Sequence, residues 1–175
     1  MADTLLESID LETAPDPAAA VIWMHGLGAD GSDFVPIVRE LDLSGCPPVR
    51  FVFPHAPTMP VTINGGYIMR AWYDILGAEA PMREDEAGLR ASQAAVERLI
   101  AREKARGIPA HRIVLAGFSQ GWAMTLATGV RPTSSRTHWC RGMADPYSRG
   151  IRPFYRAARI ARRPPRRRCG GGVRE

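Results

Sequence analysis

The sequence is poor in cysteine and lacks both a long apolar run and a basic leader. Its three cysteines, Cys46, Cys140 and Cys169, are scattered, odd in number and form no Cys-x-x-Cys pair, so no disulfide framework is expected. No apolar segment approaches the ~20 residues that a membrane helix needs. Residues 1–17 have no basic run and no long apolar stretch, which excludes a secretory signal. These absences predict a soluble protein in a reducing, cytoplasmic setting.

The net charge of +5 conceals two segments of opposite sign. Residues 1–130 carry ten Lys and Arg against sixteen Asp and Glu, whereas residues 131–175 carry thirteen Arg, no Lys and two acids. A basic tail joined to an acidic body can mark binding to nucleic acid or to a membrane surface. It can also mark a segment whose origin differs from that of the rest of the chain.

Short apolar runs bounded by glycine or proline predict buried strands in the first 130 residues. Asn64-Gly65 suits a hairpin turn that needs positive φ at both central residues. The expected strands cover residues 18–25, 49–54 and 113–116, and the expected hairpin covers 60–74.

Helical periodicity separates these strands. Ser32 or Asp33 would cap a first helix that runs to about Leu41, and Gly107 would end a second helix over about 83–106. A third helix is expected over 119–128. The alternation of strands and helices predicts an α/β domain, with a mainly parallel sheet flanked by helices.

The last part of the chain follows neither period. Pro, Gly and Arg dominate residues 131–175, where a weak helix at 153–163 is the only regular element expected. The sequence therefore predicts a partial α/β domain over residues 1–130 and an Arg/Pro/Gly-rich, largely disordered tail over 131–175.

The stretch Gly117-Phe118-Ser119-Gln120-Gly121 matches the pattern Gly-x-Ser-x-Gly and stands between an apolar strand and a helical segment. This is the context of a nucleophile elbow, a sharp strand-to-helix turn that exposes a serine hydroxyl. Backbone N–H groups at the helix amino terminus can stabilise an oxyanion there. The bare pattern arises by chance in about 6% of chains of this length, and its strand and helix context lowers that figure.

A second motif, His25-Gly26-Leu27-Gly28, follows the first apolar strand. The loop at this place in a serine hydrolase is the usual origin of the other oxyanion donor. An ordinary glycine turn with a structurally satisfied His25 is the alternative interpretation. Taken together with the serine motif, the functional interpretation is favoured.

Three stretches occur in order: VIWMHGLGADGSDF, FPHAPTMPVTINGGYIMRAWYDI and AGFSQG. They resemble the bacterial carboxylesterase and acyl-protein thioesterase family of α/β hydrolases over about residues 10–130. The resemblance implies hydrolysis of carboxylic esters or acyl thioesters through an acyl-serine intermediate, without a cofactor or a metal. It implies Ser119 as nucleophile and the backbone N–H groups of Leu27 and Gln120 as the oxyanion hole. The residues that support the two motifs are His25, Gly26, Gly28, Gly117 and Gly121.

Trp72 lies in a stretch that the family keeps near its cleft, so it is a candidate cleft residue. A packed aromatic at the end of a strand is the alternative, and it is favoured because strands are rich in aromatic residues.

The partners that Ser119 needs are missing. A serine nucleophile requires a general base, usually a histidine oriented by a carboxylate, and α/β hydrolases place the acid and then the histidine after the serine. Beyond Ser119 the sequence holds only His138, Asp145 and Glu175, with the histidine ahead of Asp145. We therefore expect hydrolysis to be impaired because the Asp and His of the triad are absent.

No histidine is expected to replace the missing base. His138 is interpreted as a mobile histidine of the tail. His111 stands at the start of the third strand, at the opposite end from Ser119, and His55 is interpreted as structural.

Without later strands, residues 113–116 would form an exposed apolar edge, which predicts self-association. Our hypothesis is that residues 1–130 are the front part of a hydrolase and that an out-of-frame segment replaces the rest. A coding sequence in which no frame near codon 130 yields a strand–Asp–His pattern would contradict it.

Three classes of function follow from these features. The first is a hydrolase acting on a small-molecule ester or acyl thioester. The second is a catalytically inactive, hydrolase-like binding protein. The third is a nucleic-acid-associated protein acting through the basic tail, which is disfavoured because the tail matches no nucleic-acid-binding fold and has few aromatics.

Overall fold

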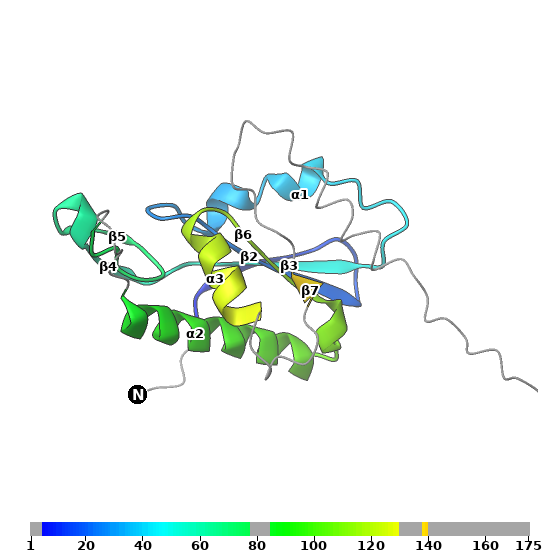
Figure 1. Ribbon diagram of the computed structural model, residues 1–175. Helices are drawn as coiled ribbons and strands as arrows, with labels where there is room; N and C mark the ends of the chain where they lie inside the picture. Colours follow the sequence, from blue (N-terminus) through cyan, green and yellow to red (C-terminus); the bar gives the residue numbers. More distant parts are fainter. Residues whose placement is uncertain (1–4, 78–84, 130–137, 140–175) are drawn as a thin grey trace, which may run out of the picture.

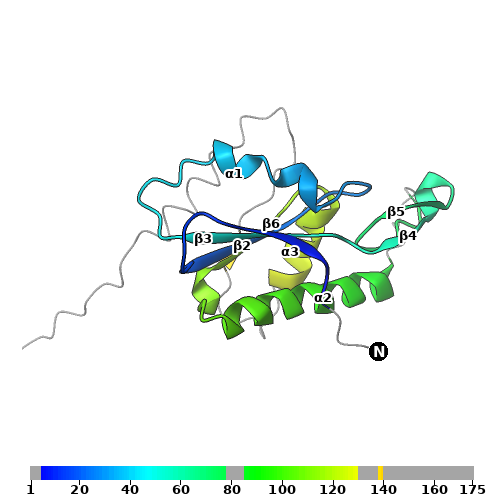
Figure 2. The same ribbon diagram turned by 180° about the vertical axis from the view of Figure 1, so that it is seen from behind.

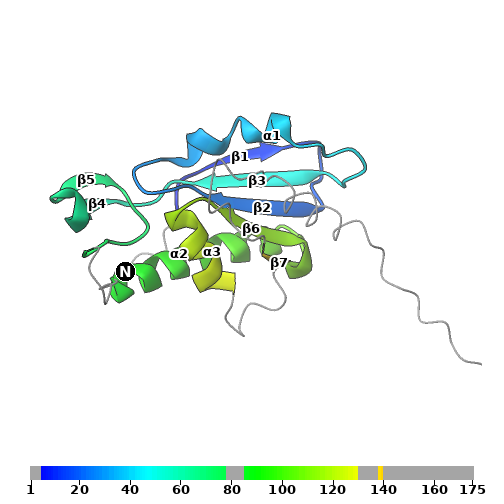
Figure 3. The same cartoon turned by 45° about the horizontal axis from the view of Figure 1, so that its top comes forward.

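The computed structural model describes residues 5–77, 85–129 and 138–139. Its main sheet has five strands in the order β1-β3-β2-β6-β7, and the order can be followed in Figure 3. The strands are β1 (Ser8–Glu12), β2 (Ala19–Met24), β3 (Val49–Pro54), β6 (Ile113–Gly117) and β7 (His138–Trp139). All neighbours pair in parallel except β1, which is antiparallel to β3. The mainly parallel sheet predicted from the sequence is confirmed.

Helices cover both faces of the sheet (Figures 1 and 2). One face is covered by a 3₁₀ turn, η1 (Gly31–Phe34), and by α1 (Ile37–Glu40). The opposite face is covered by α2 (Glu86–Ala105) and α3 (Gln120–Gly129). None of the helices in the described part of the chain is both long and apolar enough to cross a membrane.

The two faces of β2 belong to two separate apolar clusters, because successive side chains of a strand point to opposite sides. Ile22 and Met24 pack in a cluster with residues of α2 and α3. Val21 and Trp23 pack in a second cluster with residues of η1 and α1. The central strand is therefore buried on both faces, which explains its uninterrupted apolar sequence.

A hairpin of β4 (Thr58–Val61) and β5 (Tyr67–Arg70) projects from the end of the sheet at which β3 ends (Figure 1). Its existence confirms the prediction, but the turn differs from the expected one. The residues with positive φ are Gly65 (65°) and Gly66 (78°), whereas Asn64 ends a short 3₁₀ turn, η2 (Thr62–Asn64). The connection is longer than two residues, so the left-handed positions fall on the two glycines.

The first expected helix is two short pieces. Pro36 separates η1 from α1, because a proline has no N–H for a continuous helix. The predicted caps, Ser32 and Asp33, were wrong. Asp30 caps η1 by accepting a hydrogen bond from the backbone N–H of Ser32 at 2.6 Å, and Asp33 accepts one from the backbone N–H of Asp30 at 3.0 Å.

The outer strands differ most from expectation. β1 was not predicted, and the prediction of β6 as the outermost strand was wrong because β7 pairs with it. Strand β7 has only two residues, with His138 opposite Val114 and Trp139 opposite Leu115. Self-association through this edge stays a prediction. The expected helix at 153–163, the expected tail disorder, Cys140 and Cys169 lie outside the described residues, and Cys46 is a free thiol.

Candidate active site

The two loops that carry the sequence motifs start side by side. β2 and β6 are adjacent and parallel, with Met24 opposite Gly117 at their carboxyl ends. The backbone N–H of Phe118 donates to the carbonyl of Met24 at 3.1 Å. Because parallel strands end at the same edge of a sheet, the serine motif and the His25–Gly28 motif face a common space.

Ser119 occupies a sharp turn between β6 and α3. Its φ is +51°, in the left-handed region that non-glycine residues rarely adopt. Its carbonyl accepts the N–H of Trp122 at 3.0 Å, so α3 starts directly after it. The side chain is exposed although both neighbouring elements are buried. This is the geometry of a nucleophile elbow.

Two glycines allow the turn to pack against the sheet. A Cβ on Gly117 would lie 2.2 Å from the carbonyl oxygen of Gly121. A Cβ on Gly121 would lie 2.2 Å from the carbonyl oxygen of Met24 and 2.6 Å from that of His25. Any larger residue at either position would push α3 away from β2.

The other loop approaches the serine through Gly26 and Gly28. A Cβ on Gly26 would lie 3.5 Å from the Cβ of Ser119. Gly28 has a φ of 74° and donates its N–H to the carbonyl of Arg70 at 2.9 Å. Between these glycines, the N–H of Leu27 donates to no acceptor among the described residues, and the same holds for the N–H of Gln120.

His25 is a structural residue. It is fully buried, its Nε2 accepts the N–H of Ala56 at 3.0 Å, and its Nδ1 lies 2.7 Å from the carbonyl oxygen of Gly26. The Nε2 atom accepts a hydrogen bond, so the proton of the neutral ring sits on Nδ1 and is donated to Gly26. Burial lowers the pKa of His25, which keeps the ring neutral. His25 thus shapes the loop and has no free nitrogen for proton transfer.

Trp72 is fully buried and packs in the apolar cluster on the α2 side of the sheet, which favours the packing interpretation; its role as a cleft residue stays a prediction. Its Nε1–H donates to the carbonyl of His25 at 2.9 Å. The sequence did not indicate that the side chain of Gln120 also binds this segment. That amide accepts the N–H of Trp72 at 2.9 Å and donates to the carbonyl of Tyr73 at 2.7 Å.

Among the described side chains, neither His55 nor His111 forms a hydrogen bond with Ser119. His55 accepts the N–H of Gly31 on Nδ1 at 3.2 Å. His111 is exposed in η3 (Ala110–Arg112), before the first residue of β6. The backbone of His138 lies opposite Val114, three residues before the end of β6, which is ~10 Å at the usual rise of a strand. Asp145 and Glu175 lie outside the described residues.

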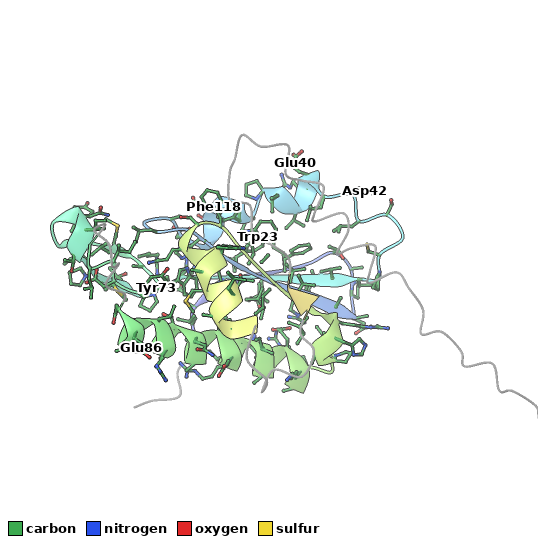
Figure 4. The ribbon with its side chains drawn as sticks, in the orientation of Figure 1. Trp23, Glu40, Asp42, Tyr73, Glu86 and Phe118 are labelled. Carbon is green, nitrogen blue, oxygen red and sulfur yellow. The ribbon has the colours of Figure 1, made fainter. Side chains whose placement is uncertain are left out.

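Aromatic rings flank the elbow on the α1 side. The rings of Phe34 and Phe118 are 5.9 Å apart, and those of Trp23 and Phe34 are 5.5 Å apart. Figure 4 labels Phe118 at the turn that leads into α3, with Trp23 beside it. Within residues 5–77, 85–129 and 138–139, no group of three His, Cys, Asp or Glu is placed to hold a metal ion.

Comparison with known proteins agrees with this geometry. The phospholipase/carboxylesterase family matches residues 10–137. Acyl-protein thioesterase 1 of Neurospora crassa is 47% identical over 123 residues, which are 64% of this chain and 48% of that protein. Acyl-protein thioesterase 1 homolog 1 of Dictyostelium discoideum is 37% identical over 124 residues, which are 70% of this chain and 55% of that protein.

A solved structure supports the fold. Acyl-protein thioesterase 2 of Zea mays superposes with a TM-score of 0.58 at 28% identity, covering 74% of this chain and 57% of that one. The chain spans about half the length of the curated relatives that it matches.

Proposed function

Because the chain belongs to the phospholipase/carboxylesterase family, we propose that it is a serine hydrolase that forms an acyl-serine intermediate at Ser119. The observation that carries the proposal is the left-handed, exposed serine at the start of α3, facing a glycine loop. The oxyanion that develops during attack would accept hydrogen bonds from the N–H groups of Leu27 and Gln120.

The proposed reaction has two steps. The Ser119 oxygen attacks the carbonyl carbon of a carboxylic ester or acyl thioester and loses its proton. The C–O or C–S bond to the leaving group breaks, the leaving group takes up a proton, and the acyl group remains on the serine. Water then attacks the acyl-serine and releases a carboxylic acid and the free hydroxyl. No metal or cofactor takes part in the proposal.

We propose that turnover is impaired. The nitrogens of His25 and Nδ1 of His55 are engaged in backbone contacts, and His111 stands at the wrong end of β6. With the base removed, an oxyanion hole and substrate binding still leave roughly 10³-fold acceleration over water. A substrate with a good leaving group would therefore acylate Ser119 slowly, and the ester formed would persist because no base activates water.

The substrate class is narrowed by the relatives. Two of them are named acyl-protein thioesterases, which favours an acyl thioester over a simple ester as the substrate proposed here. The proposed setting is the cytoplasm, where the free thiol of Cys46 would remain reduced. Comparing an acyl thioester with the oxygen ester of the same chain length would separate the two substrate classes.

The test is the release of a chromogenic alcohol from a short-chain ester, compared with Ser119→Ala. The proposal expects a burst of about one product per protein molecule followed by slower release, because the acyl-serine hydrolyses even more slowly than it forms. Ser119→Ala should show no burst. Equal release by both folded proteins would overturn the proposal and favour the inactive, ligand-binding alternative.

The nucleic-acid alternative rests on the basic tail, residues 131–175. Of these residues the structure describes only His138 and Trp139. A peptide of the basic tail that leaves the migration of DNA unchanged at low salt would eliminate it.

A further inference from the structure

The segment from Arg70, the last residue of β5, to Tyr73 is hydrogen-bonded to the glycine loop on both sides of Leu27. The carbonyl of Arg70 accepts the N–H of Gly28 at 2.9 Å. The indole N–H of Trp72 donates to the carbonyl of His25 at 2.9 Å. Two hydrogen bonds, one before Leu27 and one after it, therefore fix the glycine loop to the same short segment.

The same segment is bonded to the start of α3 through the side chain of Gln120. Its Oε1 accepts the N–H of Trp72 at 2.9 Å and its Nε2 donates to the carbonyl of Tyr73 at 2.7 Å. Both ends of a planar amide are thus fixed by consecutive residues. Gln120 is 5% exposed and Trp72 is fully buried, so neither contact is exchanged readily for water.

We infer that the side chains of Gln120 and Trp72 are positioning residues that set the distance between the two oxyanion donors. The inference rests on the proposed function, since the donors in question are the N–H groups of Leu27 and Gln120. Each donor must lie about 2.7–3.1 Å from the developing oxyanion. Residues 70–73 are hydrogen-bonded to the glycine loop and to the side chain of Gln120. They therefore fix the distance between the two N–H groups before substrate binds.

A purely structural role would also explain buried hydrogen bonds, so the test must separate stability from chemistry. Gln120→Met removes both side-chain hydrogen bonds and keeps the backbone N–H and most of the volume. Trp72→Phe removes only the bond to the carbonyl of His25 and keeps an aromatic ring. The matched control is Gln93→Met, because Gln93 is 6% exposed, donates to Glu97 at 3.0 Å within α2, and forms no hydrogen bond with either loop among the described residues.

The experiment measures the acylation rate of Ser119 by an activated ester and by the corresponding thionoester, in which sulfur replaces the carbonyl oxygen. Sulfur is larger and a weaker acceptor, so it depends less on well-placed N–H donors. Folded protein is quantified in parallel by urea denaturation.

We expect Gln120→Met to slow acylation by the ester about tenfold, less than the loss of a whole donor, and to slow the thionoester less. Trp72→Phe should act in the same direction, and it keeps the inference testable if Gln120→Met does not fold. Gln93→Met should lower stability but leave the ratio of the two rates unchanged.

Two results would overturn the inference. Wild-type rates in both Gln120→Met and Trp72→Phe would show that the contacts do not position the donors. Equal slowing of ester and thionoester, in proportion to the loss of folded protein, would show a structural role alone. A wild-type protein that never acylates Ser119 would overturn the proposed function itself, and the inference with it.

Discussion

At the residue scale, the candidate site depends on positions that hold no side chain. Gly121 lets the first turn of α3 touch β2, and Gly26 leaves the space beside Ser119 open. The conformation of the elbow therefore depends on close packing around it, since a serine in the left-handed region persists only where its surroundings hold it in place.

Gly121→Ala should destabilise the protein by about 3 kcal/mol, because its Cβ would overlap two backbone carbonyl oxygens that cannot move independently of β2. Urea denaturation measures the loss. Gly77→Ala is the control, since beyond its chain neighbours no atom of the described residues lies within 4 Å of a Cβ at Gly77, and it should change stability by less than about 0.5 kcal/mol. Equal effects of the two substitutions would contradict the close packing of α3 on β2.

The buried His25 makes stability depend on pH. Burial lowers the pKa of His25 below its ordinary value of 6.5, so below that value the unfolded chain binds a proton that the folded chain does not. Its contribution to stability is complete above pH 6.5 and is lost as the pH falls toward the lowered pKa.

Urea denaturation between pH 7 and pH 5 tests this contribution. His25→Gln, which removes the titrating ring, should lose less stability over this range than the wild type. An unchanged slope in His25→Gln would show that His25 is not the group responsible.

At the element scale, helix α2 begins at a side-chain cap. Asp85 accepts the N–H of Gly88 at 2.8 Å, and its other oxygen accepts the N–H of Asp74 at 3.2 Å. The cap therefore also ties α2 to the chain that leaves the hairpin.

Asp85→Ala should lower the free energy of unfolding by about 1 kcal/mol, the usual value of an N-cap. Asp85→Asn keeps an acceptor oxygen and should retain most of that stability. Thermal or urea denaturation compares them, and an alanine variant as stable as the wild type would show that the cap is dispensable.

Whether a strand or helix could be predicted from the sequence depends on how fully neighbouring elements bury it. The buried strands β2, β3 and β6 were predicted within about two residues of their observed bounds, because strands covered on both faces read as continuous apolar runs. β1 was missed because its five residues, SIDLE, are only partly buried and do not form an apolar run. β7 was missed because a strand of two residues is too short to show an alternating pattern. The first helix is split at Pro36, and the prediction from periodicity did not take this proline into account.

The candidate site shows the same limit. Its two motifs are local in sequence, so Ser119 and the glycine loop could be predicted as a pair. The contact between Gln120 and Trp72 joins residues 48 positions apart, and no spacing rule connects them. The sequence favoured packing for Trp72, but it gave no sign of the hydrogen bond from its indole N–H to the carbonyl of His25.

At the scale of the whole molecule, a charged cluster joins the outer part of the sheet to α2. The carboxylate of Glu103 is fully buried and lies 2.8 Å from Arg102 and 3.3 Å from both Arg50 and Arg106. The contact with Arg50 is an ion pair without hydrogen-bond geometry. Asp10 of β1 lies 2.9 Å from Arg102, so three elements share the cluster.

Glu103→Gln should destabilise the protein by about 2 kcal/mol, because it removes the buried charged acceptor that three partly exposed arginines share. Glu97→Gln, at an exposed position of the same helix, is the matched control and should shift stability by no more than about 0.5 kcal/mol. Similar urea midpoints for both variants would show that the cluster adds little to the fold.

The most direct test of the central claim is peptide mass analysis after exposure of the folded protein to an activated short-chain ester. We predict one acyl group on the peptide that contains Ser119, accumulating over time, and none at that peptide in Ser119→Ala. The same protein with no acyl group on Ser119, or with acyl groups only on other residues, would contradict the account.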